Sequence, residues 1–204
     1  MSKVKPKKAE LFIDMTAMSD VTVLLLTFFM LTATFLPKEP IQVTTPPSVM
    51  EIKIPEANLL TILVKDDGQV YLNLDRNEDK LAVLGLISER YTGISSFTNS
   101  QKMSFINQPI IGVPISFLPQ FLDMSVQDQD DYLKSSGVPT DSLNNQLADW
   151  IRYAKEVNSE LKIAIKADQE TTYPKVNNII STLQDLKENR FHLITTLKGM
   201  PEGY

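Results

Sequence analysis

The sequence predicts an α+β protein that consists of a single N-terminal transmembrane helix, an extended tether and a small exported domain of sheet and helices. Three observations lead to this prediction. An apolar run lies close to the N-terminus, a proline-rich stretch follows it, and the remainder carries strand-like and helix-like apolar patterns in turn. The length of 204 residues suffices for these parts and one core of ordinary size.

The apolar run spans residues 12–36 and is interrupted only by Asp14, Asp20 and small hydroxyl side chains. As a helix it would be roughly 37 Å long, which is enough to cross a hydrocarbon core of about 30 Å with some tilt. Four lysines lie among the first eight residues, so the positive-inside rule places residues 1–11 in the cytoplasm. A cleaved signal peptide has a shorter apolar region and a small-residue cleavage site, so we favour an uncleaved anchor.

Asp20 is a carboxylate well inside this run. On a helical wheel Thr27 lies about 20° from it, and Thr16 and Thr34 lie about 40° from it, so the four residues form one polar stripe. Threonines can satisfy themselves on backbone carbonyls, and an aspartate can reach toward the interface. Asp20 lies roughly 12 Å into the helix, however, and its side chain is short. We therefore interpret it as a functional carboxylate.

An aspartate near the centre of a membrane helix costs about 3 kcal/mol, which the apolar neighbours can offset. An apolar environment favours the neutral carboxyl and a wet environment favours the carboxylate, so Asp20 can exchange a proton as its surroundings change. A membrane potential contributes about 2.3 kcal/mol per charge per 100 mV, which is similar to the cost of burial. One aspartate on one helix makes no proton path, so a partner helix bundle is implied.

Residues 37–58 form the predicted tether, because five prolines disfavour both helix and packed sheet. Within it "MEIKIP", residues 50–55, alternates apolar and polar side chains like a strand. Two interpretations remain open: a plain linker, or a segment that adds to a sheet edge of this chain or of another protein.

Residues 59–204 are predicted to form the exported domain. "LLTILVK" and "QVYLNL" flank an Asp66-Asp67-Gly68 turn and predict a hairpin. Residues 78–91 predict a helix whose apolar face includes Leu81, Leu84 and Ile87.

The C-terminal part predicts a strand, a helix and a second strand. "LKIAIKA" is the first strand, Thr172 is the possible N-cap of the helix with Pro174 in its first turn, and "RFHLITTL" is the second strand. A helix of this length between two strands suggests a parallel crossover. His192 is expected to be an ordinary sheet residue, because no triad-like arrangement surrounds it.

Residues 92–140 are predicted to be an insertion, rich in Ser, Asn, Gln and Pro, that contains the apolar "PIIGVPISFLPQFLDM". This apolar stretch is either a packing element or a docking surface. A helix over about 141–157 follows, with an apolar face that comprises Leu143, Leu147, Trp150, Ile151 and Ala154.

Composition argues against several other functions. The net charge is −5, and the part beyond the apolar run carries about −6, since 16 of the 20 basic and 22 of the 25 acidic residues follow it. Such a surface does not suit a nucleic acid. The chain has no cysteine, and its seven glycines form no phosphate-binding loop. We expect no cofactor, no metal and no enzymatic activity.

The stretch "FIDMTAMSDVTVLLLTFFM", residues 12–30, resembles the membrane anchor of the ExbD/TolR family. Asp20 takes the position of that family's proton-carrying aspartate, and Thr16 matches its threonine, whereas Ala17 replaces a common proline. "EIKIPEAN", residues 51–58, resembles the family's segment before its periplasmic domain. Residues 59–73 and 161–198 resemble that domain's opening hairpin and closing strand–helix–strand.

The resemblance implies a single-pass protein of a bacterial inner membrane, with its C-terminal domain in the periplasm. It would belong to a motor driven by the proton motive force, with an ExbB/TolQ-like channel protein, a dimer partner that is a second copy or a paralogue, and a TonB-like transducer. Ile52, Ile54 and Pro55 would form the partner-binding segment. The alternative is a passive anchored module that binds peptidoglycan or an envelope protein and gives Asp20 no role.

Overall fold

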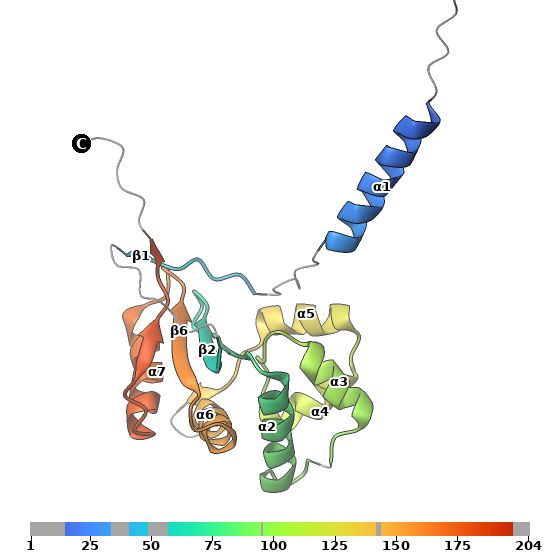
Figure 1. The fold of residues 1–204 in the computed structure, drawn as a ribbon. Coiled ribbons are helices and arrows are strands. Elements are labelled where there is room, and N and C mark those ends of the chain that lie inside the picture. Colours follow the sequence, from blue (N-terminus) through green and yellow to red (C-terminus); the bar gives the residue numbers. More distant parts are fainter. Residues whose placement is uncertain (1–14, 34–40, 49–56, 95, 142–143, 198–204) are drawn as a thin grey trace, which may run out of the picture. The chain divides into compact units, whose positions relative to one another are not determined.

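A computed structural model of the chain describes residues 15–33, 41–48, 57–94, 96–141 and 144–197 (Figure 1). They belong to two compact units, one up to Lys38 and one from Glu39 onward. Among these residues, the first unit contains one helix, and the second contains the sheets and the other helices.

The described part of the first unit is helix α1, Thr16–Thr32. Its side chains are all exposed, and Val, Leu, Phe and Met dominate between Val21 and Leu31. Residues 12–14 and 34–36 of the predicted membrane span lie outside the described residues. No helix in the described part of the chain combines the length and the apolar character needed to cross a membrane.

The second unit is built on a four-stranded sheet of order β3-β2-β6-β7. Strands β2, Leu59–Val64, and β3, Val70–Leu74, form an antiparallel hairpin, as predicted. Strand β6, Lys162–Ala167, is parallel to β2 on one side and to β7, Phe191–Leu193, on the other. The predicted α+β class and the parallel strand–helix–strand unit are therefore confirmed.

The hairpin turn is fixed by local chemistry. Gly68 has φ +88°, a conformation that glycine adopts without a steric cost. The Asp67 carboxylate accepts a hydrogen bond from the Gln69 N–H at 2.9 Å, and the Lys175 ammonium donates to the Asp67 carbonyl. The turn is thus held by its own side chains and by a lysine of helix α7, Tyr173–Asp185.

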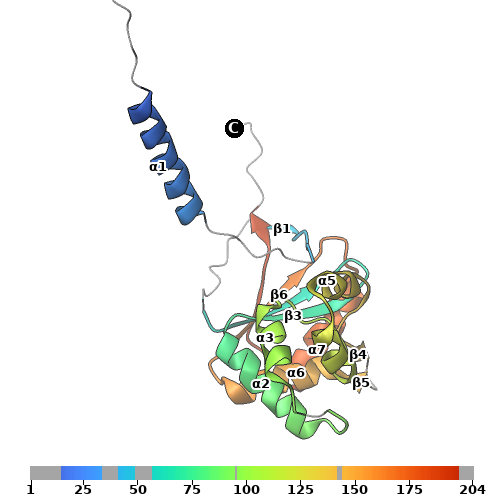
Figure 2. The same cartoon turned by 90° about the vertical axis from the view of Figure 1, so that its right-hand side faces the viewer.

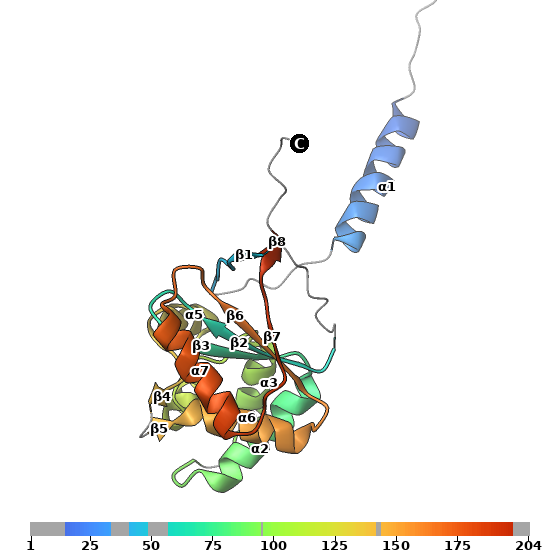
Figure 3. The ribbon, with the colours of Figure 1, turned by 90° about the vertical axis from the view of Figure 1, so that its left-hand side faces the viewer.

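Three helices pack with the sheet: α2, Asn77–Arg90; α6, Gln146–Val157; and α7, Tyr173–Asp185 (Figures 2 and 3). Their buried apolar side chains share one core with the buried apolar side chains of the strands. This core includes Leu60, Ile62, Val64, Ile163, Ile165, Leu84, Ile87, Leu147, Trp150, Ile151, Ile179 and Leu183.

Two sequence-based expectations about these helices need correction. Leu81 is 37% exposed, because α2 instead turns Asp79, Lys80 and Val83 inward, where both charged groups have hydrogen-bond partners. Helix α6 begins at Gln146 rather than at about 141, since the Asn145 side chain caps it by accepting from the Ala148 N–H.

The residues before α6 form the short pair β4, Thr140–Asp141, and β5, Asn144–Asn145. Leu143 lies outside the described residues.

The insertion is largely helical. It contains α3, Asn99–Asn107; a 3-10 turn η1, Ile115–Phe117; α4, Leu118–Asp123; and α5, Val126–Ser135. The apolar side chains of its central stretch are buried in the common core: Ile110, Ile111, Val113, Ile115, Leu118, Phe121 and Leu122. This stretch is therefore a packing element.

The last predicted strand is divided in two. Strand β7 ends at Leu193, and β8, Thr196–Leu197, pairs in parallel with β1, Pro47–Ser48, instead of continuing along β6 (Figure 3). The sequence of residues 190–197 carries no break that marks this division, so the pattern alone does not show where the chain changes its pairing partner.

Candidate functional site

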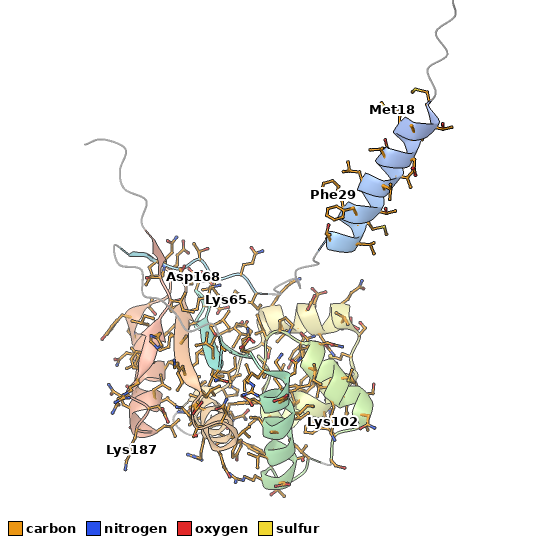
Figure 4. The ribbon with its side chains drawn as sticks, in the orientation of Figure 1. Met18, Phe29, Lys65, Lys102, Asp168 and Lys187 are labelled. Atoms are coloured by element: carbon orange, nitrogen blue, oxygen red, sulfur yellow. The ribbon has the colours of Figure 1, made fainter. Side chains whose placement is uncertain are left out.

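The polar stripe predicted around Asp20 lies on helix α1. Thr16, Asp20 and Thr27 are within Thr16–Thr32 and follow the helical spacing that puts them on one face, whereas Thr34 lies outside the described residues. Asp20 is the only charged side chain of this 17-residue helix. Figure 4 labels Met18 and Phe29 toward its two ends.

Three threonines of α1, Thr22, Thr27 and Thr32, bond to their own helix. Thr27 Oγ1 donates to the Leu24 carbonyl at 2.9 Å, and Thr22 Oγ1 donates to the Met18 carbonyl at 2.7 Å. These bonds satisfy the hydroxyls without a second chain. The Asp20 carboxylate, by contrast, has no hydrogen bond or ion pair within the described residues.

Such an arrangement has a chemical consequence. An unpaired carboxylate on an otherwise apolar helix responds to whatever covers that helix, since apolar surroundings favour its neutral form and polar surroundings favour its charged form. Apart from this carboxylate, helix α1 carries no ionisable side chain. Any proton path must therefore use groups from another molecule or from water.

The second unit carries a strand-like segment that the sequence did not reveal. Residues 41–48 fall within the predicted tether, 37–58, and precede the predicted domain. In the structure, however, Ile41 and Val43 are 4% and 8% exposed and belong to the core. The Thr44 N–H donates to Asp168 Oδ2 at 2.9 Å, and the Gln169 N–H donates to the Thr44 carbonyl at 2.9 Å. The available signal in the sequence was the alternation of apolar Ile41 and Val43 with polar Gln42 and Thr44. Two apolar residues are too few for this signal to predict a strand.

The predicted partner-binding residues Ile52, Ile54 and Pro55 lie outside the described residues. The described residues end at Ser48 of β1 before this segment and resume at Ala57, just before β2. Figure 4 labels Asp168, which accepts the hydrogen bond from Thr44, and Lys65 close to it.

Buried titratable groups of the second unit serve the fold. The Tyr71 hydroxyl donates to the Leu133 carbonyl at 2.8 Å, and burial raises the pKa of Tyr71 strongly. Burial lowers the pKa of the Lys80 ammonium, which donates to the Gln108 carbonyl at 2.9 Å. His192 lies in β7, half-buried, opposite Ala164.

Among the residues that the structure describes, no three His, Asp or Glu side chains lie together in a way that could hold a metal ion.

The fold and the site define a two-part chain: an apolar helix with one carboxylate, followed by a small α+β domain. The family model for biopolymer transport protein ExbD/TolR matches residues 6–198, nearly the whole chain. The chain therefore belongs to the ExbD/TolR family. No curated protein and no solved structure matches it significantly.

Proposed function

We propose that this chain is the proton-coupling subunit of a motor that is driven by the proton motive force and energises transport across the outer membrane. Family membership supports the coarse role in biopolymer transport and a non-enzymatic function. The observation that carries the finer role is the position of Asp20, the one charged side chain on helix α1.

In this proposal α1 is the core of a single-pass anchor in a bacterial inner membrane, with residues 1–11 in the cytoplasm and the second unit in the periplasm. An ExbB/TolQ-like protein surrounds the anchor and supplies the proton path, and a second copy or a paralogue supplies a paired helix. Membership of the ExbD/TolR family supports these assignments.

Protonation of Asp20 would remove the charge from its helix face and allow that face to lie against apolar surroundings. Loss of the proton on the cytoplasmic side would restore the preference for polar surroundings. Because the cost of burial and the contribution of the membrane potential are both a few kcal/mol, the exchange can be driven in one direction. The helix motion would reach a TonB-like transducer through residues 37–58 and the second unit.

The decisive experiment replaces Asp20 by Asn, which keeps the size of the side chain and removes its titration. We expect proton flux in vesicles that contain this chain and its co-purified channel partner to fall to background. Asp20→Glu is expected to retain part of the flux, because it keeps a carboxyl group.

Thr27→Val tests the polar face beside Asp20, and Thr22→Val is its matched control. Both hydroxyls bond to carbonyls of their own helix, but only Thr27 lies on the Asp20 face. Reduced flux is expected for Thr27→Val and unchanged flux for Thr22→Val. Normal flux in Asp20→Asn, at a normal protein level, would leave only the passive anchored binding module.

A further inference from the structure

A concave surface lies at the end of the second unit where strands β6 and β7 begin. Its volume is about 440 Å³, within the range of ligand pockets. Lys162, the first residue of β6, lines it together with Arg190, which directly precedes β7, and His192 of β7. Lys187, which follows α7, also lines it, and Figure 4 labels this lysine at the opposite end of the unit from Lys65 and Asp168.

Positive charge exceeds negative charge on this surface. Four cationic side chains and two carboxylates line it, which leaves a net charge of +2. Glu188 is engaged by Lys155 at 3.0 Å, with the two side chains 28% and 22% exposed. Lys162, Lys187 and Arg190 have no ion pair with any residue that the structure describes. This concentration of cations stands on a part of the chain that is acidic as a whole.

Helix dipoles account for only part of the excess. Helices α6 and α7 end close to Lys155 and Lys187 in the sequence, and each helix C-terminus carries roughly half a negative charge. Two such ends offset about one positive charge. Lys162 and Arg190 belong to the strands and their approach, so they are not explained as helix-end cations. A surplus of positive charge therefore remains beside the cavity.

The residue types indicate which ligand chemistry suits this cavity. The arginine guanidinium offers a planar fork that binds phosphate or carboxylate with two hydrogen bonds, and lysine adds compact charges around it. A phosphate group carries close to two negative charges at neutral pH and three acceptor oxygens, whereas a carboxylate carries one charge. Several cations without an ion pair around one cavity therefore match the charge of a phosphate better than the single charge of a carboxylate.

We propose that the cavity lined by Lys162, Lys187, Arg190 and His192 binds a phosphate-bearing ligand. Arg190 binds the phosphate oxygens directly, Lys162 and Lys187 supply charge on either side, and His192 offers a further ring nitrogen. A soluble phosphate compound has this chemistry in full, and a phospholipid headgroup, whose phosphodiester carries one negative charge and two free oxygens, has it in part. The site does not depend on Asp20 and adds a binding function to the second unit.

The test measures how fast each lysine of the full chain is acylated, with mass spectrometry of the peptides as the readout. One arm adds inorganic pyrophosphate to the chain in an uncharged detergent. The other compares the chain in phosphatidylglycerol nanodiscs with the chain in phosphatidylcholine nanodiscs. Lys102, on α3 in the insertion, is the internal reference in both arms (Figure 4).

We expect slower acylation of Lys162 and Lys187, with Lys102 unchanged, and loss of this protection at high salt. Protection by pyrophosphate identifies a soluble phosphate ligand, and protection by phosphatidylglycerol alone identifies a lipid headgroup; either supports the proposal. Arg190→Gln should weaken binding by about tenfold or more, because it removes the charge-assisted hydrogen bonds of the guanidinium fork.

Arg152→Gln is the matched control, because Arg152 lies on α6 outside the cavity and pairs with Asp149. Trp150 fluorescence shows whether each variant is folded. The proposal is overturned if neither phosphate source protects the two lysines, if Lys102 is protected equally, or if Arg190→Gln and Arg152→Gln behave alike.

Discussion

Leu72 of strand β3 and Ile111 of the insertion exchange both of their backbone hydrogen bonds. The Leu72 N–H donates to the Ile111 carbonyl at 2.8 Å, and the Ile111 N–H donates to the Leu72 carbonyl at 2.7 Å. The Val138 N–H adds a third bond to the Val70 carbonyl at 2.8 Å. The insertion therefore closes the outer edge of β3, an edge that would otherwise expose unpaired backbone groups.

This contact depends on Gly112. A Cβ at this position would lie 2.2 Å from Cδ1 of the Tyr71 ring, so the backbone approaches the ring as only glycine allows. We expect Gly112→Ala to lower the free energy of unfolding by about 1–3 kcal/mol through overpacking. A urea titration followed by fluorescence of Trp150, the single tryptophan, measures it, because this ring stacks on Phe105 of the insertion.

Gly85→Ala is the control for that experiment. Gly85 lies in α2, and an added Cβ there would meet nothing within 4 Å. This variant is expected to gain about 0.5–1 kcal/mol, because alanine loses less conformational freedom in a helix. Equal stability of the two variants would mean that the insertion does not pack tightly on Tyr71 in solution.

The hairpin and the closing strand–helix–strand were predictable because their patterns are local. The residue pattern of each strand within 59–74 is contained in that strand, and the spacing of Ile179 and Leu183 is contained in helix α7. The insertion was not predictable in the same way. The bonds between Leu72 and Ile111 join backbone groups 39 positions apart, and backbone groups leave no trace in the residue types.

Buried polar side chains were missed for the same reason. Gln129 is 1% exposed and donates to the Phe121 carbonyl at 2.9 Å, while Gln146 accepts from the Ile115 N–H at 2.7 Å. A glutamine reads as a surface residue unless its partners are known. The Asp20 site, in contrast, could be proposed from sequence, since a single carboxylate in an apolar helix is conspicuous by itself.

Tyr71 and Tyr91 are expected to make the fold less stable at high pH. Burial raises the pKa of both hydroxyls, and for Tyr91 the Asp149 carboxylate adds to the effect. An unfolded chain loses these protons near pH 10, whereas the folded chain keeps them. The stability that they contribute is complete below about pH 10 and is lost progressively above it.

Tyrosinate absorbance during an alkaline titration measures this effect. Of the six tyrosines, Tyr71 and Tyr91 should ionise only together with unfolding. In Tyr71→Phe one fewer tyrosine should be released at the unfolding transition. Ionisation of all six tyrosines before Trp150 fluorescence changes would contradict the prediction.

Lys80 is expected to make the free energy of unfolding rise with pH, opposite to the effect of the two tyrosines. Because burial lowers its pKa, the folded chain releases this proton at a lower pH than the unfolded chain, which releases it near pH 10.4. The unfolded state therefore binds more protons in that window, and stability rises with pH. The advantage of the wild-type chain over Lys80→Met should grow as the pH approaches about 10.4.

Lys80→Met also removes the donor to the carbonyls of Ile106 and Gln108, at 3.3 and 2.9 Å, beside the end of α3. We expect a loss of about 1–3 kcal/mol at neutral pH from these unsatisfied groups. Lys102→Met, at an exposed position of α3, should change stability by less than about 0.5 kcal/mol. Urea titrations at several pH values measure both the loss and its slope.

Asp168 should hold residues 41–48 against the rest of the second unit. Its Oδ2 accepts from the Thr44 N–H at 2.9 Å, and its Oδ1 accepts from the Glu170 N–H at 3.0 Å. Asp168→Ala removes both bonds, and from the loss of the bond to Thr44 we expect amide exchange at Thr44 to quicken about fivefold, equivalent to about 1 kcal/mol for a half-exposed bond.

Glu170→Ala is the control for this exchange experiment, because within the described residues its carboxylate accepts no hydrogen bond. The amide of Gln169, which donates to the Thr44 carbonyl, should follow Thr44 in Asp168→Ala and stay protected in Glu170→Ala. Equal exchange in both variants would mean that burial of Ile41 and Val43, and not this carboxylate, fixes the segment.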